Sequence, residues 1–142
     1  MQTKQDPSEV GGQEVAAQEE KAREPEMKDP LCGLLNREAV VRYIEKRLFA
    51  MAEADSCALF LIDLGDFSRV NATLGRQAGD RVLRQAAQIL SGLFRANDVV
   101  GRLGGDEFVV FLAGQIPEKA ARAKGAQICT QLQLVLGDAP GI

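Results

Sequence analysis

The chain has 142 residues, of which 46% are hydrophobic and 26% charged, and a net charge of −3. This length suits one small domain with a single core. We expect a cytoplasmic protein, because no apolar run is long enough to span a membrane and the N-terminus lacks a hydrophobic leader. Residues 1–30 carry four Lys/Arg against eight Asp/Glu, and the remainder thirteen against twelve. The globular part is therefore near neutral, which excludes a basic surface for nucleic acid.

The first segment, residues 1–28, is rich in Gln, Glu, Lys and Ala and poor in large apolar side chains. It cannot bury enough surface to offset its ordering entropy, so we predict a disordered or partly helical linker before a domain over 29–142. The cysteines Cys32, Cys57 and Cys129 are odd in number and lack metal-ligand spacing. We expect them to be reduced and mostly buried.

From Asn36 onward, the apolar periodicity alternates between helix and strand. The pattern predicts, in order, a helix capped by Asn36 and ending near Glu53, a strand at 57–63, a short helix at 67–74, a longer helix opening at Asp80, strands at 98–101 and 108–112, and a last helix from Pro117 and Glu118. This order indicates an α/β sandwich in which helices flank a central sheet.

The most informative run is Arg102-Leu103-Gly104-Gly105-Asp106-Glu107-Phe108. Paired glycines between two strands favour a tight hairpin, and carboxylates at its tip suit a hard divalent cation that carries phosphates. A hairpin whose acidic residues merely face water is the alternative. Asp63 ends another apolar run, where a charge can still be solvated. Two strands that present carboxylates at one sheet edge would form a metal-nucleotide site.

Three separated blocks together resemble the GGDEF domain family of diguanylate cyclases, which condense two GTP molecules into cyclic di-GMP. The blocks are Asp29-Pro30-Leu31-Cys32-Gly33-Leu34-Leu35-Asn36-Arg37, then Asp63 to Asn71 with Gly75 and Gly79-Asp80, and then the hairpin. The resemblance extends from Asp29 to about Leu136 and implies a palm-like, ferredoxin-related nucleotidyl-cyclase fold with a central antiparallel sheet. It also implies further strands and a helix after Ile142, so we expect a C-terminally truncated domain.

The resemblance assigns the metal and catalytic roles to four residues. Asp63, the Leu64 carbonyl and Asp106 would bind Mg²⁺ or Mn²⁺. Asp106 would also help to activate the attacking 3′-hydroxyl, with Glu107 beside it. Such chemistry needs mainly positioning and charge neutralisation.

The resemblance also implies a substrate site for GTP. Asn71 and Asp80 would read guanine, which offers a carbonyl acceptor and N–H donors. Caps of a turn and of the following helix are the alternative roles for these two residues. The remaining candidate substrate contacts, made to phosphates, are Ser68, Arg102, Gly104 and Gly105.

Arg95 and Asp98 lie at the offset before the hairpin where many cyclases carry an inhibitory cyclic di-GMP site. Arg can grip a phosphate and stack on guanine, while Asp accepts from the guanine edge. A plain ion pair at a helix terminus is the alternative.

The second block departs from the family pattern. Gly65 replaces a usual Asp, Ser68 a Lys, Ala72 an acidic residue and Arg76 a His. Three functions therefore stay open: a diguanylate cyclase active as a homodimer in a longer chain, a degenerate domain that senses cyclic di-GMP, and a GTP-binding regulatory domain that controls a fused sensor or phosphodiesterase. We expect this fragment alone to be inactive.

Overall fold

The structure is a computed structural model that describes residues 27–65 and 67–137, so most of the predicted linker over 1–28 lies outside the described residues. The elements, in chain order, are α2 (Arg37–Ala50), β1 (Ser56–Asp63), α3 (Phe67–Leu74), α4 (Arg76–Leu93), β2 (Val99–Gly104), β3 (Glu107–Gly114) and α5 (Glu118–Leu136). In these two ranges no helix combines the length and the apolarity that a membrane span needs.

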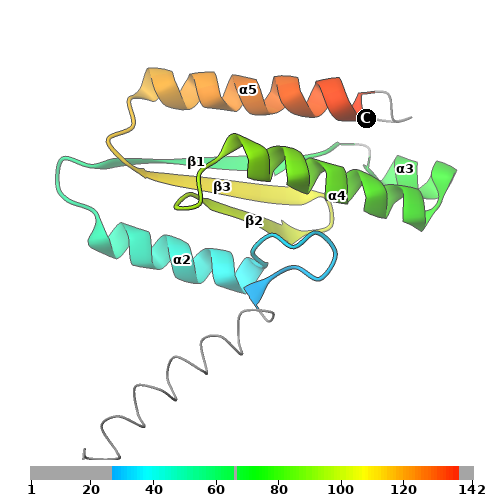
Figure 1. Cartoon of the computed structure of the whole chain (residues 1–142), viewed down its shortest axis with the longest axis horizontal. Helices are drawn as coiled ribbons and strands as arrows, with labels where there is room; N and C mark the ends of the chain where they lie inside the picture. Colours follow the sequence, from blue (N-terminus) through cyan, green and yellow to red (C-terminus); the bar gives the residue numbers. More distant parts are fainter. Residues whose placement is uncertain (1–26, 66, 138–142) are drawn as a thin grey trace, which may run out of the picture.

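The three strands form an antiparallel sheet in the order β1-β3-β2. Figure 1 shows them side by side, with α5 along the β1 side and α2 along the β2 side. In the β1–β3 ladder, Ser56 pairs with Gly114 at one end and Asp63 with Glu107 at the other. This register places the acidic end of β1 beside the hairpin that joins β2 to β3.

Successive side chains of β3 point to opposite faces of the sheet, and they are apolar on both faces. Helices therefore pack on both faces of this strand. Phe108 and Val110 belong to the core formed with α3, α4 and α5. Val109 and Phe111 pack with Val40 of α2 in a second cluster. The α/β sandwich with a central antiparallel sheet is thus confirmed.

Most predicted element bounds agree with the structure to within three residues, and α4 is the exception. It begins at Arg76, four residues before Asp80. The break that precedes it is Gly75, whose φ of +90° suits glycine, and the N–H of Gly79 donates to the Gly75 carbonyl at 3.2 Å. The prediction that Asp80 opens the helix was wrong, because glycine ends the preceding turn without a side-chain cap.

The prediction of mostly buried cysteines was also wrong. Cys57 and Cys129 are exposed, and only Cys32 is partly buried. Cys57 belongs to the outward row of β1, which alternates with a half-buried row. Leu59 and Leu61 share that exposed row. A continuous apolar run therefore did not mean that both faces of β1 were covered.

Candidate active site

The hairpin tip consists of Gly105 and Asp106, between the paired residues Gly104 and Glu107. Gly104 has a φ of +140° and Gly105 a φ of +52°, values that strain any residue with a β-carbon. The Leu64 N–H donates to the Asp106 carbonyl at 3.2 Å. This bond attaches the hairpin to the end of β1, so residues 64 and 106 meet although 42 positions separate them in the sequence.

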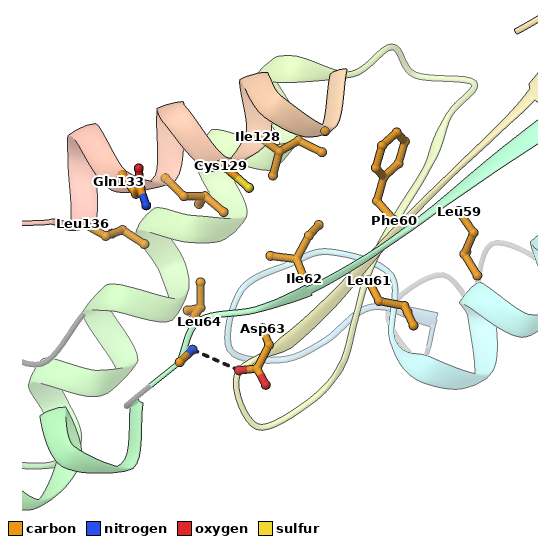
Figure 2. Close-up of a pocket in the computed structure, with 13 residues that line it drawn as sticks. Leu59, Phe60, Leu61, Ile62, Asp63, Leu64, Ile128, Cys129, Gln133 and Leu136 are labelled. Carbon is orange, nitrogen blue, oxygen red and sulfur yellow. Dashed lines mark hydrogen bonds between the residues drawn. The ribbon is translucent and has the colours of Figure 1, made fainter. Parts of the chain in front are cut away.

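The β1–β3 register and the Leu64–Asp106 backbone bond bring Asp63 and Asp106 close enough for the two carboxyl groups to interact. Burial, together with the hydrogen bond and charge of Asp63 and the charge of Glu107, raises the pKa of Asp106 above its ordinary value. Asp63 is held from its other side, since the Gly65 N–H donates to its Oδ1 at 3.0 Å, the dashed line in Figure 2. The structure therefore brings together the two carboxylates that the sequence assigned to one site.

This pair fits a divalent cation that is shared with phosphates. Among residues 27–65 and 67–137, no three His, Cys, Asp or Glu side chains are grouped to hold a metal alone. Mg²⁺ in nucleotide sites is usually bound by one or two carboxylates plus substrate phosphates rather than by a protein cage. Asp63, Asp106 and the Leu64 carbonyl could supply the protein donors of such a site, and metal binding stays a prediction.

A groove of about 680 Å³ runs from Asp63 along the space between β1 and α5 (Figure 2). Apolar side chains make up most of its wall, including Phe60, Ile62, Ile128 and Leu132. Such a wall offers nothing to a triphosphate, so we place the candidate chemistry at the Asp63 end and not along the groove.

Asn71 on α3 packs against α4 at Gly79, the residue before Asp80. Its Oδ1 atom is buried and has no hydrogen-bond partner among the described residues. A buried amide oxygen without a partner is uncommon and costly. The local alternatives find no support here: the turn bond to Gly75 uses the Asn71 backbone carbonyl, and Asp80 lies inside α4. The guanine-reading roles of Asn71 and Asp80 stay predictions, and in this arrangement the Asn71 oxygen itself is covered by α4.

Ser68 is an exposed residue in the first turn of α3, close in sequence to the Asp63 end of β1. Arg69 and Arg76 are exposed as well. Ser68 can donate one hydrogen bond to a phosphate but brings no positive charge. Its predicted substrate role stays a prediction.

Arg102 has protein partners of its own. Its Nη1 atom bridges both oxygens of Asp29, and its Nε and Nη2 atoms donate to the Gly105 carbonyl at 3.0 and 2.8 Å. The side chains of Arg102 and Asp29 are only 15% and 13% exposed. The predicted phosphate contact of Arg102 therefore competes with an ion pair that is already formed.

Arg95 and Asp98 form a closed turn at the start of β2. The Arg95 N–H donates to Asp98 Oδ2 at 2.9 Å, and the Asp98 N–H donates to the Arg95 carbonyl at 3.0 Å. Both residues line a hollow of about 540 Å³ that is also lined by Lys28, Tyr43 and Arg47. The six residues of β2, or about 20 Å of extended chain, lie between the Arg95–Asp98 turn and the hairpin tip.

The family model "Diguanylate cyclase, GGDEF domain" matches residues 26–136. The chain belongs to the GGDEF family. A curated relative is the "Probable diguanylate cyclase DgcJ" of Escherichia coli (strain K12), 36% identical over 95 residues that make up 66% of this chain and 19% of that protein. An "Uncharacterized protein in hutH 5'region" of Streptomyces griseus is 36% identical over 123 residues, 84% of this chain and 51% of that protein.

Solved structures agree with this assignment. The diguanylate cyclase SiaD of Pseudomonas aeruginosa, solved with its activator SiaC, has a TM-score of 0.68 and 28% identity, covering 91% of this chain and 48% of that chain. The GGDEF domain of DgcB from Caulobacter crescentus, solved with c-di-GMP, has a TM-score of 0.66 and 25% identity, covering 72% of this chain and 60% of that chain. The GGDEF domain described here spans about a fifth to a half of the length of the two curated relatives.

Two residues of this GGDEF domain gained no role from sequence reasoning. Asp29 was quoted as part of the first block, but its partner Arg102 is 73 positions away. Gly79 was quoted in the second block without a role, although a β-carbon there would overlap Asn71 Oδ1. A signal for Asp29 did exist, because Asp before Pro often accepts backbone N–H groups two and three residues on, as Asp29 does from Leu31 and Cys32.

Proposed function

We propose that this GGDEF domain is the catalytic part of a diguanylate cyclase, which condenses two GTP molecules into cyclic di-GMP with release of pyrophosphate. The observation that supports this function is the Asp63–Asp106 pair, placed by the β1–β3 register and by the Leu64–Asp106 backbone bond. Two neighbouring carboxylates at a glycine-rich hairpin are suited to sharing a cation with a triphosphate.

The protein's part in the reaction is to position the substrate. Mg²⁺ or Mn²⁺, when bound, supplies neutralisation of phosphate charge and polarisation of the attacked phosphorus. Asp63 and Asp106 would hold that cation, and Glu107 adds negative charge beside them. The glycines at 104 and 105 leave room for a phosphate chain to approach the backbone. Asp106 is also the candidate acceptor for the proton of the attacking 3′-hydroxyl.

Asn71 and Asp80 would recognise the guanine base. The amide of Asn71 and the carboxylate of Asp80 can together pair with the carbonyl and the N–H groups of guanine. Recognition of one base per domain requires two domains, each with its own GTP, to face one another. We therefore propose an active homodimer.

The function is tested by incubating a version extended to full domain length with GTP and Mg²⁺ and quantifying cyclic di-GMP and pyrophosphate by chromatography and mass spectrometry. Product that disappears in Asp63→Asn and Asp106→Asn, but persists in the surface control Glu118→Gln, supports the cyclase. If the wild type binds GTP in the presence of Ca²⁺ but forms no product in the presence of Mg²⁺, the GTP-binding regulatory domain is indicated instead. The absence of both GTP binding and product contradicts the cyclase and the regulatory domain alike.

A second candidate function is the sensing of cyclic di-GMP at the hollow beside β2. It joins three cationic side chains, Lys28, Arg47 and Arg95, with the Tyr43 ring and the Asp98 carboxylate. Cyclic di-GMP presents two phosphates and two guanines, which guanidinium groups can both pair with and stack on. Calorimetry with cyclic di-GMP should show that Arg95→Ala loses binding and that Arg122→Ala, on α5, keeps it. Equal heats for wild type and Arg95→Ala exclude this site.

A further inference from the structure

We propose that Arg102 and Asp29 are a positioning pair that fixes the hairpin turn carrying Asp106. The proposal rests on the proposed function only in so far as Asp106 binds a cation; the geometric effect on the turn is independent of it. It assigns Arg102 a role different from phosphate binding, and it assigns a role to Asp29, which had none from the sequence.

The guanidinium of Arg102 connects two separate segments. Nη1 lies 3.1 and 3.0 Å from the two oxygens of Asp29, while Nε and Nη2 lie 3.0 and 2.8 Å from the Gly105 carbonyl. These bonds draw on all three guanidinium nitrogens, which leaves little of the fork for a phosphate. Only an arginine has the planar, multi-donor geometry that serves both partners at once.

Asp29 is itself held rigidly. Its Oδ1 accepts the N–H groups of Leu31 and Cys32 at 2.9 and 3.1 Å, and its own N–H donates to the Leu34 carbonyl at 2.6 Å. The turn formed by residues 29–34 is in turn docked on β2, because the Arg102 N–H donates to the Leu35 carbonyl at 2.9 Å. Arg102 therefore connects the hairpin to Asp29, whose position is fixed by the turn over 29–34.

A hydrogen bond to the Gly105 carbonyl constrains the position of Asp106. This carbonyl belongs to the peptide unit that joins the two residues, and this unit is planar, so holding the oxygen also holds the Asp106 nitrogen and Cα. The next carbonyl, that of Asp106, is held by the Leu64 N–H. Two glycines leave the turn with little stiffness of its own. Arg102 and Leu64 together supply the constraint.

Hydrogen exchange of the Leu64 amide in the full chain tests the pair, because its acceptor is Asp106 and neither Asp29 nor Arg102 touches it. We expect Arg102→Gln and Asp29→Asn each to speed this exchange roughly tenfold. The double variant should exchange no faster than the faster single variant, because the two residues act as one unit. Arg102→Lys keeps the charge without the fork and should give an intermediate rate.

Arg122→Gln is the matched control. It removes an Arg ion pair with Glu118 whose side chains are both 79% exposed, and it should leave the Leu64 amide unchanged. The amides of Val109 and Val110 report global opening. Unchanged Leu64 exchange in Arg102→Gln overturns the proposal. So does a rise that only follows the rise at Val109 and Val110, because it means general destabilisation.

Mn²⁺ affinity, measured without nucleotide, separates positioning from phosphate binding. Positioning predicts that Arg102→Gln and Asp29→Asn both weaken Mn²⁺ binding, roughly tenfold or more, since residues that support metal ligands typically have that effect. A phosphate contact predicts unchanged Mn²⁺ affinity, weaker GTP binding in Arg102→Gln alone, and normal Leu64 exchange, which overturns the pair. A wild type that binds no Mn²⁺ without nucleotide is compatible with a cation shared with phosphates, and the Leu64 amide then decides the pair.

Discussion

The Oδ1 atom of Asn71 occupies the space that a side chain at Gly79 would need. A β-carbon at position 79 would overlap this oxygen and lie 3.1 Å from the ring of Phe67. The close approach of α3 and α4 therefore depends on glycine at this position. It also sets the position of the amide that we propose reads guanine.

We expect Gly79→Ala to lower the free energy of unfolding by about 1–3 kcal/mol, because the added methyl group overpacks the α3–α4 contact. Gly92→Ala in the same helix is the matched control. No atom lies within 4 Å of its added β-carbon, so it should raise stability by about 0.5–1 kcal/mol through helix propensity. Urea titrations measure the free energy of unfolding of both variants. A Gly79→Ala variant that is more stable than the wild type would contradict the packing of α3 on α4.

The Asp29–Arg102 pair predicts a pH-dependent contribution to stability. Burial would raise the pKa of Asp29, but the N–H groups of Cys32 and Leu31 and the charge of Arg102 outweigh it, and the pKa falls below its ordinary 3.8. A lowered carboxyl pKa gives stability that is present above the unfolded value and is lost as the pH falls through the folded one.

Wild type should therefore be more stable than Asp29→Asn by about 1 kcal/mol at neutral pH, and this difference should persist down to about pH 5 and vanish below the folded pKa. Thermal unfolding of both proteins at several pH values measures it. A difference that grows on acidification would contradict the sign worked out above.

Thiol reactivity should separate the three cysteines. Burial and the nearby charge of Asp29 raise the pKa of the Cys32 thiol, so less of it is thiolate at a given pH. Cys57 and Cys129 are exposed. With an aromatic disulfide reagent near pH 8 we expect two fast phases and one slower by roughly tenfold. In denaturant the three rates should converge; a fast Cys32 in the folded chain would be the contrary result.

The outward row of β1 should promote self-association. Leu61 is 71% exposed and Leu59 lies beside it on a strand at the edge of the sheet. Unpaired edge strands with apolar side chains favour pairing between chains. Leu61→Thr should reduce concentration-dependent association in sedimentation experiments. Leu134→Thr replaces a leucine of equal exposure, 70%, on α5 and should change little. Equal behaviour of the two variants would exclude the strand edge as the cause.

Local signals predicted the elements well where they were strong. The bounds of α3 at Phe67 and Leu74 and the start of α5 after Pro117 agree with the structure, and Asn36 caps α2 through the Ala39 N–H. The start of α4 was missed because Asp80 is a good capping residue by type, whereas Gly75 acts only through its backbone.

The candidate site was partly predictable for a different reason. Asp63 ends an apolar run and Asp106 follows two glycines, so each carries a local sign of its position. Their contact, however, depends on the register of β1 against β3. The contact between Arg102 and Asp29 carries no local sign, since the two residues meet only after the hairpin and the turn over 29–34 have docked. Long-range pairs of this kind follow from packing and not from pattern.

The way in which β1 pairs with β3 has a consequence for folding. Every rung of that ladder joins residues more than forty positions apart, from Ser56 with Gly114 to Asp63 with Glu107. Chain closure over such distances is slow compared with helix formation. The two acidic side chains can meet only after this closure, so the affinity for divalent cations should emerge late in refolding, after the helical signal has already returned.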